Sequence, residues 1–367
     1  MTRIRELSFT PLDVPLIEPF GIATGAQVIA HNVLVHVCFD DGTTGLGEAA
    51  PFPAVNGETQ ASVLAVLPDA ARALAGRDAT RFRPLAEAAR EAVGSVKSAL
   101  CAVETALLDA FCRRAHLSLW EFFGGAEAEL ETDITIPTGE VEHAHAAALR
   151  AQNAGFGTLK VKVGGAAPEL DLARLRAIGA AAPRAALILD ANASLSADEA
   201  VRLLDALGEL RERVVLFEQP TAAVDLDGLR AVLERGRVSV AADESARSAA
   251  DVAALARAGA GDVVNVKLMK AGLLEAWDMI ATARAANLGL MIGGMVETEL
   301  AMTTSASLAA GLGGFRFVDL DTPLFMGKRP LVGGFAQTGA RLGLRAAGPG
   351  HGVGTSAIRG KPATVQG

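Results

Sequence analysis

The sequence predicts an α/β fold, in which a barrel of parallel strands and helices follows a smaller antiparallel region. Two observations carry this prediction. From about residue 131 onward, short apolar runs alternate with alanine-rich helical stretches, the pattern of βα units around a buried parallel sheet. Residues 1 to about 45 instead are typical of antiparallel strands, with strict alternation in the segment NVLVHVCF and a turn signal after it.

The N-terminal region combines such strands with helices. In the segment NVLVHVCF, every second residue from Val33 to Phe39 is apolar, so these side chains share one face of a strand. The DDG that follows is a turn signal. Helical patterns are predicted at about 58–75 and 96–115.

The rest of the chain contains eight strand candidates. Helix-like segments separate them, beginning with 142–153, 168–181 and 196–210. Eight strands in βα alternation favour a closed barrel over an open doubly wound sheet. In chain order the candidates are TDITI, LKVKV, ALILD, VVLFE, VSVAADE, DVVNVKL, LGLMIGG and FRFVDLD.

Chemically active residues recur at the carboxyl ends of these strands, at intervals of 24 to 28 residues. In a barrel these ends meet at one mouth, where barrel active sites are built. A single charged residue at a strand end is more often a helix cap, as Asp198 and Asp227 illustrate. Capping does not explain a whole series in phase, which comprises Lys162, Asp190, Glu218, Asp243, Lys267, the Gly293–Gly294 pair, and Asp319 with Asp321.

Three members of this series predict a metal site. Asp190, Glu218 and Asp243 would bring three carboxylates together, and these repel one another unless a cation joins them. Ligation by carboxylate oxygens alone suits Mg²⁺, with Mn²⁺ as a substitute, and disfavours zinc and iron. Lys160 and Lys162 point to the same side of their strand, so we expect them to face this negative pocket and a bound anion.

Two lysines on either side of a divalent cation suit the removal of a proton next to a carboxylate. The metal and a nearby lysine stabilise the enediolate that forms. If Lys162 and Lys267 flank the same carbon, one removes a proton and the other returns one to the opposite face, which is racemisation or epimerisation. If a single base suffices, the reaction is an elimination or a cycloisomerisation, and the residues alone leave both open.

At this point the chain resembles the enolase superfamily, muconate-lactonising subgroup. The motifs that carry the resemblance are KVKVG, LILDAN, LFEQP, ADES, NVKLMKAG, GGMVET and DLDTP. The resemblance implies an N-terminal α+β capping domain (1–128), a TIM-like (β/α)₇β barrel (129–325) and a C-terminal segment (326–367) that packs back on the cap. It also implies that Lys162 and Lys267 are the acid/base pair, that Lys160 assists the substrate carboxylate, and that the three carboxylates bind Mg²⁺.

The DLDTP motif resembles dipeptide epimerases, in which two acidic residues hold the α-ammonium group of the substrate. Here these are Asp319 and Asp321, and two carboxylates at positions i and i+2 form a trap for a cation. The resemblance therefore implies 1,1-proton transfer at the α-carbon of the C-terminal residue of an L,L-dipeptide, through a metal-stabilised enediolate.

The expected second residue of the dipeptide is uncharged or apolar. The loop PFGIATGAQ (19–27) has no Lys or Arg where the epimerases specific for glutamate carry a basic residue. Gly294 replaces the hydroxyl residue usual in the family and should leave more room, or offer only its backbone. The further candidate substrate contacts are Met295, Thr24 and Thr135.

Composition limits the possible partners. The net charge of −8 argues against nucleic acid and anionic membranes, and no apolar run has transmembrane length. We expect a soluble, cytoplasmic homo-oligomer that acts on a small molecule. Alternative functions are another reaction of the subgroup (o-succinylbenzoate synthase, N-acylamino acid racemase or muconate cycloisomerase) and a non-catalytic barrel that binds a metal or a peptide.

Overall fold

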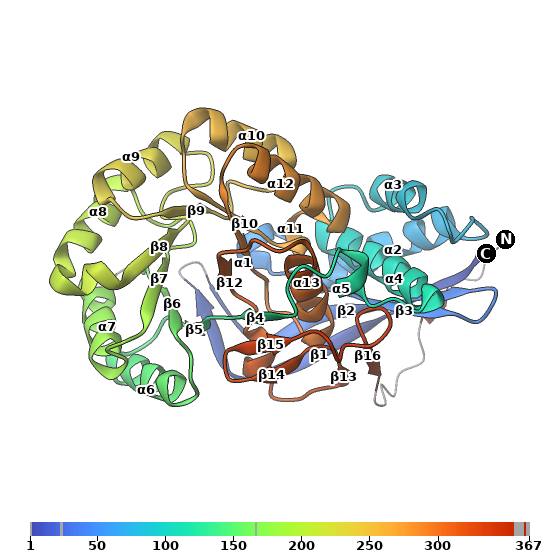
Figure 1. The fold of residues 1–367 in the computed structure, drawn as a ribbon, viewed down its shortest axis with the longest axis horizontal. Helices are drawn as coiled ribbons and strands as arrows, with labels where there is room; N and C mark the ends of the chain where they lie inside the picture. Colours follow the sequence, from blue (N-terminus) through green and yellow to red (C-terminus); the bar gives the residue numbers. More distant parts are fainter. Residues whose placement is uncertain (1, 23–24, 166, 356–362, 365–367) are drawn as a thin grey trace.

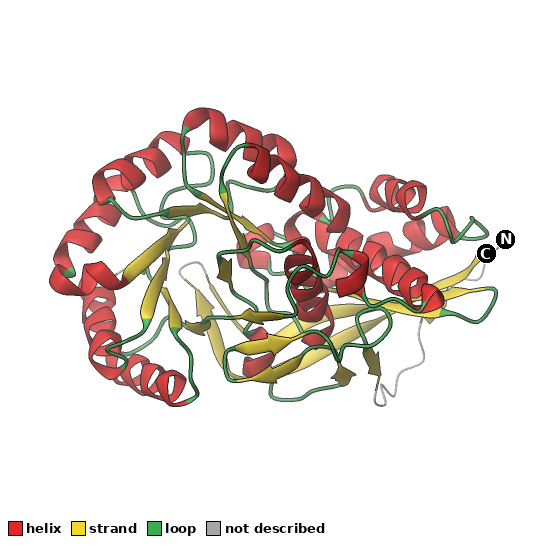
Figure 2. Ribbon diagram, in the orientation of Figure 1, coloured by secondary structure: helices red, strands yellow, loops and turns green. Residues whose placement is uncertain are grey.

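The computed structural model describes residues 2–22, 25–165, 167–355 and 363–364. A curled parallel sheet ringed by helices forms one part, and a long antiparallel sheet with its own helices forms the other (Figures 1 and 2). The predicted α/β fold, a barrel with an N-terminal α+β cap, is confirmed. No helix of the described residues is long and apolar enough to cross a bilayer.

The cap is built on an antiparallel sheet in the order β17-β1-β2-β3. The alternating residues of β2 are buried against α2 and α4, because their shared face meets these helices. Glycines at 45 and 47 allow α4 to lie close to β3, since a Cβ at either position would collide with the backbone carbonyl of Ala106 or Ala102. The elements are β1 (Ile4–Ile22), β2 (Gly25–Phe39), β3 (Thr44–Ala49), β17 (Ala363–Thr364), α1 (Pro53–Asn56), α2 (Gln60–Leu74), α3 (Phe82–Val93), α4 (Lys97–Ala115) and α5 (Leu119–Phe122).

The barrel strands follow one another in sequence order, and each pairs in parallel with the next. The first and last strands meet where the N–H of Asp133 donates to the carbonyl of Val318 at 2.9 Å. The strands match the eight predicted runs: β5 (Ile134–Ile136), β6 (Thr158–Lys162), β7 (Ala186–Asp190), β8 (Val214–Glu218), β9 (Val240–Ala242), β10 (Val263–Val266), β11 (Gly289–Ile292) and β12 (Phe317–Val318).

Helices cover the outside of this sheet, and α6 to α10 and α12 form an arc around it (Figure 1). Inside it, six apolar side chains from six strands form a cluster of their own, among them Ile188, Leu216 and Ala241. Each of these three lies two residues before a predicted metal ligand, so the metal ligands point inward one layer above an apolar floor. The barrel helices are α6 (Val141–Asn153), α7 (Pro168–Ala181), α8 (Ala197–Ala206), η1 (Gly208–Arg213), α9 (Leu226–Gly236), α10 (Ala249–Ala258), α11 (Leu268–Ala271), α12 (Leu273–Ala285) and α13 (Glu299–Leu312).

The chain after the barrel contacts the cap. Arg113 on α4 donates to the carbonyl of Val353 at 2.7 Å, and Asp109 accepts from the N–H of the buried His351 at 3.0 Å. Strand β17 pairs with β1. The elements after the last barrel strand are η2 (Thr322–Phe325), β13 (Leu331–Gly333), β14 (Ala336–Thr338), β15 (Arg341–Gly343) and β16 (Val353–Thr355). Strand β15 pairs with β4 (Glu129–Glu131), which precedes the barrel.

Helix α3 was not predicted. Its sequence FRPLAEAAREAV is nevertheless amphipathic, and its proline lies in the first turn, where a helix tolerates it. Packing forms the helix, since Leu85, Ala89 and Val93 are buried against α2 and α4.

Candidate active site

The predicted site residues gather at the carboxyl ends of the barrel strands. Lys162, Asp190 and Glu218 are the last residues of β6, β7 and β8. Asp243 directly follows β9, and Lys267 directly follows β10 as the residue before α11. All five are at least 95% buried, so their charges interact strongly.

The two lysines expected to act as acid and base lie on opposite sides of the barrel. Strands β6 and β10 are separated by β7, β8 and β9 in one direction and by β11, β12 and β5 in the other. Lys162 and Lys267 line the same pocket. This is the arrangement that proton transfer on both faces of one carbon requires.

Lys160 lies lower in the barrel, among three carboxylates. Its Nζ is 3.0 Å from Asp190 Oδ2, 2.7 Å from Glu218 Oε2 and 2.6 Å from Asp319 Oδ2. Burial by itself lowers the pKa of Lys160, but these carboxylates outweigh burial and hold the pKa well above its ordinary value. Lys160 is therefore a permanent cation, and it connects the predicted metal ligands Asp190 and Glu218 with Asp319.

Lys162 is held by two neighbours. Its Nζ lies 2.6 Å from Asp190 Oδ2 and donates to Asn192 Oδ1 at 3.2 Å. Asn192 has a left-handed backbone (φ 45°), and its own amide donates to Glu244 Oε1 at 3.3 Å. Asn192 and Glu244 were not predicted as site residues, although both stand in motifs that carry the family resemblance, LILDAN and ADES.

Lys267 and Lys270 contact the two oxygens of the same carboxylate. Lys267 Nζ is 2.7 Å from Asp243 Oδ2, and Lys270 Nζ donates to Asp243 Oδ1 and to the carbonyl of Asn265. Burial by itself lowers the pKa of Lys267, but the negative charges of Asp243 and Glu218 have a larger effect and raise it above its ordinary value. Lys270 was also missed, because a lysine three residues after Lys267 looks like a solvated helix position.

Gln219 fastens the ends of β8 and β9 together. Its side-chain oxygen accepts from the N–H groups of Asp243 and Ser245 at 2.9 and 3.0 Å. Its amide nitrogen donates to Thr221 O and Ser245 Oγ at 2.9 and 2.7 Å. Both acceptor positions and both donor hydrogens of this buried amide are used. Gln219, the residue after Glu218, therefore fixes the position of Asp243.

The three predicted metal ligands fit Mg²⁺ by their chemistry. They offer only carboxylate oxygens, and Glu218 Oε2 and Asp243 Oδ2 are buried without a hydrogen bond of normal geometry, although each lies 2.7 Å from a lysine. Burial and then Asp190 raise the pKa of Glu218 to about 7, whereas nearby lysines outweigh burial and lower the pKa of Asp190 and Asp243. Lysine ammonium groups lie between the carboxylates, so their side chains must move aside for a shared ion.

Asp319 and Asp321 follow β12 and also line the pocket. Asp321 Oδ2 accepts the backbone N–H of Thr135 at 2.5 Å, and Asp321 Oδ1 has no hydrogen-bond partner. Burial, followed by Asp319, raises the pKa of Asp321 to about 7. A buried pair of acids with a free oxygen is a receptor for a cation that can donate hydrogen bonds.

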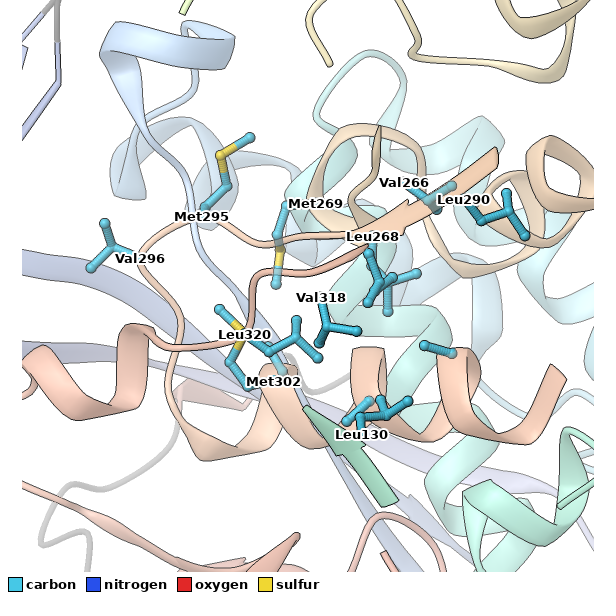
Figure 3. Packing of buried hydrophobic residues seen from close by; sticks show 14 of the residues in the cluster. Leu130, Val266, Leu268, Met269, Leu290, Met295, Val296, Met302, Val318 and Leu320 are labelled. Atoms are coloured by element: carbon cyan, nitrogen blue, oxygen red, sulfur yellow. The ribbon is translucent and has the colours of Figure 1, made fainter. Parts of the chain in front are cut away.

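One expectation about Gly294 is wrong. Gly294 and Met295 line the pocket, but a Cβ at position 294 would collide with Met302 Cε and would lie 3.0 Å from Glu297 Oε1. The missing side chain therefore makes space for Met302 in the core and does not enlarge the pocket. Figure 3 shows Met302 beside Leu320, away from the side chain of Met295.

The remaining wall of the pocket is apolar and comes mostly from the cap. The β1–β2 hairpin reaches the barrel, where the carbonyl of Gly21 accepts the N–H of Thr138 at 3.2 Å. Besides the barrel residues Thr135 and Met295, the wall contains Phe20, Ile22, Phe52 and Val55. Thr24, the other predicted contact in this hairpin, lies outside the described residues.

Glu48 joins the cap to the barrel beside this pocket. Its carboxylate accepts from Asn32 Nδ2 at 2.7 Å and from the N–H and Oγ1 of Thr298, at the start of α13. Glu297 accepts from the N–H of Met295 at 2.6 Å, and burial raises the pKa of Glu297 to about 8. Both acids therefore lie next to the site.

Comparisons with known proteins show the family of this chain. Residues 142–357 match the enolase C-terminal domain-like family model, and residues 5–124 match the N-terminal domain of mandelate racemase/muconate lactonizing enzyme. An aromatic dipeptide epimerase from Herpetosiphon aurantiacus is 50% identical over 96% of this chain and 99% of its own. A solved mandelate racemase/muconate lactonizing protein from that organism has a TM-score of 0.93 at 50% identity, covering 97% and 99% of the two chains. A dipeptide epimerase from Enterococcus faecalis V583, solved with Mg and L-Leu-L-Tyr, has a TM-score of 0.91 at 31% identity and covers 96% and 99%.

Proposed function

This chain belongs to the mandelate racemase/muconate lactonizing enzyme family of the enolase superfamily, and we propose that it is a Mg²⁺-dependent dipeptide epimerase. The observation that carries the reaction is the placement of Lys162 and Lys267 on opposite strands of one pocket. The observation that carries the substrate class is the buried Asp319–Asp321 pair in the same pocket, because a substrate without a cation would leave Asp321 Oδ1 without a donor.

The residues divide the work as follows. Asp319 and Asp321 accept the α-ammonium group of the dipeptide, and Lys160 faces the carboxylate. Lys162 or Lys267 removes the α-hydrogen of the C-terminal residue, and the other lysine delivers a proton to the opposite face of the planar enediolate. Asp190, Glu218 and Asp243 would hold Mg²⁺, which when bound supplies a Lewis acid beside the carboxylate that gains negative charge. One lysine must be neutral in order to remove a proton. A cation bound to Asp243 would offset the negative charge that raises the pKa of Lys267, so that pKa would fall.

The preferred second residue is apolar or aromatic. Phe20, Ile22, Phe52 and Val55 offer no hydrogen bond to a side-chain carboxylate. The lysines that line the pocket lie 2.6 to 2.7 Å from Asp319, Asp190 and Asp243, and none of them belongs to the apolar wall. A glutamate side chain would therefore be buried without a counter-charge, which is costly.

Hydrogen exchange in D₂O tests this proposal. A library of L,L-dipeptides is incubated with the protein and Mg²⁺, and mass spectrometry detects the gain of one deuterium at the C-terminal residue. Chelation of Mg²⁺ should abolish the exchange, and added Mg²⁺ should restore it. Lys162→Ala and Lys267→Ala should each abolish epimerisation, while exchange without inversion persists only for the epimer whose α-hydrogen faces the remaining lysine. The exposed Lys328→Ala is the matched control.

Other outcomes would replace the proposal. Exchange of N-acyl amino acids in place of dipeptides would indicate a different reaction of the subgroup. Asp319→Asn combined with Asp321→Asn should then have little effect, whereas it should disable an epimerase. Exchange of no ligand at all would indicate a binding protein.

We further propose the homo-oligomeric state and the cytoplasmic location that the sequence predicts. Light scattering on the purified protein tests the first, and fractionation of the source cells tests the second. A monomer, or a protein recovered outside the cytoplasm, would contradict them.

A further inference from the structure

A third carboxylate lies beside the Asp319–Asp321 pair. One oxygen each of Asp133, Asp319 and Asp321 lies within 4.8 Å of the other two, and all three residues are buried. Within the part of the chain that the structure describes, no other group of His, Cys, Asp and Glu meets this distance. The N–H of Asp133 donates to the carbonyl of Val318, where the first and last barrel strands meet. Because Val318 directly precedes Asp319, this bond holds Asp133 close to Asp319.

The partners of these carboxylates are unequal. Asp319 Oδ2 has Lys160 at 2.6 Å, and Asp321 Oδ2 has the N–H of Thr135. Asp133, which is 2% exposed, has no hydrogen-bond partner at either oxygen, and Asp321 Oδ1 has none either. The structure therefore contains three buried oxygens that can only accept and no donor between them, if all three acids are ionised.

The charges around Asp133 favour one shared proton. Asp319 and Asp321 approach it from the end of β12, and Glu218 from β8 adds a further negative charge, while Lys160 on β6 acts in the opposite direction. Burial first, and then Asp319 and Asp321, raise the pKa of Asp133 well above its ordinary value, against the opposite effect of Lys160. A protonated Asp133 becomes a donor and relieves both the repulsion and the missing hydrogen bonds.

We propose that Asp133 carries a proton in the working protein and donates its O–H to the Asp319–Asp321 pair. It is a positioning residue, because it does not line the pocket and reaches the substrate only through that pair. The O–H of Asp133 then orients the carboxylates of Asp319 and Asp321 and reduces the repulsion between them. The ammonium group of the substrate binds to their remaining oxygens. This role rests on the proposed dipeptide substrate, but the protonation of Asp133 does not.

Infrared difference spectroscopy tests the protonation without any substrate. The spectrum of the parent protein minus that of Asp133→Asn, recorded at neutral pH, should contain the C=O stretching band of a protonated carboxylic acid. A difference spectrum with carboxylate bands alone would overturn the proposal, whatever the enzyme turns out to epimerise. If the epimerase assignment fails and the acid band is present, only the positioning role is lost.

Kinetics with an L,L-dipeptide tests the positioning role. Asp133→Asn keeps a donor and adds no charge, so KM should stay within threefold of the parent value. Asp133→Leu removes the donor and should raise KM at least tenfold while kcat changes less than threefold. It should also move the rise of KM at low pH to a higher pH, because Asp319 and Asp321 then repel without relief. Asp278→Asn on the exposed face of α12 is the control.

An equal rise of KM in Asp133→Asn and Asp133→Leu would show that Asp133 contributes its negative charge, which contradicts the proposal. Unchanged KM in both variants would contradict it as well. Asp133→Leu could fail to fold, and Asp133→Asn with its infrared spectrum then decides alone.

Discussion

Lys270 donates to both the side chain and the backbone of Asp243, so one buried lysine fixes the whole residue that follows β9. Its third bond goes to the carbonyl of Asn265 at 2.9 Å, on the neighbouring strand β10. Burial lowers the pKa of Lys270, and Asp243 opposes that effect only in part. This lysine therefore supports a proposed metal ligand without being free to act as a base on the substrate.

Replacement of Lys270 by methionine should weaken Mg²⁺ binding. Methionine keeps the length of the side chain but leaves Asp243 Oδ1 and two carbonyls without their donor. The expected loss in Mg²⁺ affinity is about 10- to 100-fold, the range found when groups behind a metal ligand are removed. Isothermal titration of the protein with Mg²⁺ in the absence of substrate measures it. The exposed Lys328→Met is the control, and unchanged affinity in Lys270→Met would contradict the role.

A positive charge in the apolar wall should change the substrate preference. Ile22→Lys places an ammonium group in the pocket, where a substrate carboxylate can pair with it. We expect kcat/KM for dipeptides with a C-terminal Glu to rise about tenfold relative to those with Phe or Leu, since about 1.4 kcal/mol corresponds to a factor of ten. Ile17→Lys on the same strand is the control because Ile17 is 68% exposed. The same relative change in both variants would show that net charge, and not the pocket, is responsible.

A methyl group at position 294 should strain the core behind the pocket. Gly294→Ala brings a Cβ against Met302 Cε, the flexible end of a side chain. We expect a loss of about 1–3 kcal/mol in the free energy of unfolding, as for other overpacked sites. The loss should be smaller when Met302 is alanine, and a double-mutant cycle from denaturant unfolding measures this coupling. Strictly additive effects would place the Cβ elsewhere.

The contact between cap and barrel should make stability depend on pH. Glu104 on α4 accepts from the N–H groups of Leu273 and Leu274 at the start of α12, and burial raises its pKa from 4.5 to about 7 against these hydrogen bonds. The folded state then binds more protons than the unfolded state between these pH values, so the free energy of unfolding falls as pH rises from 4.5 to 7. The expected contribution is about 1–3 kcal/mol.

Glu104→Gln removes this titration and keeps an acceptor for the two N–H groups. The slope of unfolding free energy against pH should become flatter than in the parent, as denaturant unfolding at several pH values would show. Glu87→Gln, which changes an exposed acid in the cap, should leave the slope unchanged. An identical slope in Glu104→Gln would mean that Glu104 is ionised throughout.

The local repeats of the chain predicted much of the molecule. The eight strand runs, with polar residues in phase at their ends, led to the barrel and to the residues now found around its mouth, such as Lys162 and Asp190. Both signals are short-range, because side chains alternate along a strand and one βα unit takes about the same length each time. Gly294 shows the limit of this reasoning, since the sequence places it at the mouth but does not reveal that Met302 fills the space behind it.

The sequence by itself determined the fold class, the family resemblance and the types of residue at the strand ends, because these are properties of segments a few residues long. Only the tertiary structure decided which distant groups meet. It placed Asp133 beside Asp319 and Asp321 and the hairpin residues Phe20 and Ile22 in the pocket wall. These contacts depend on the closure of the barrel and on the reach of β1 and β2, and no local pattern encodes the distance between residues far apart in the chain.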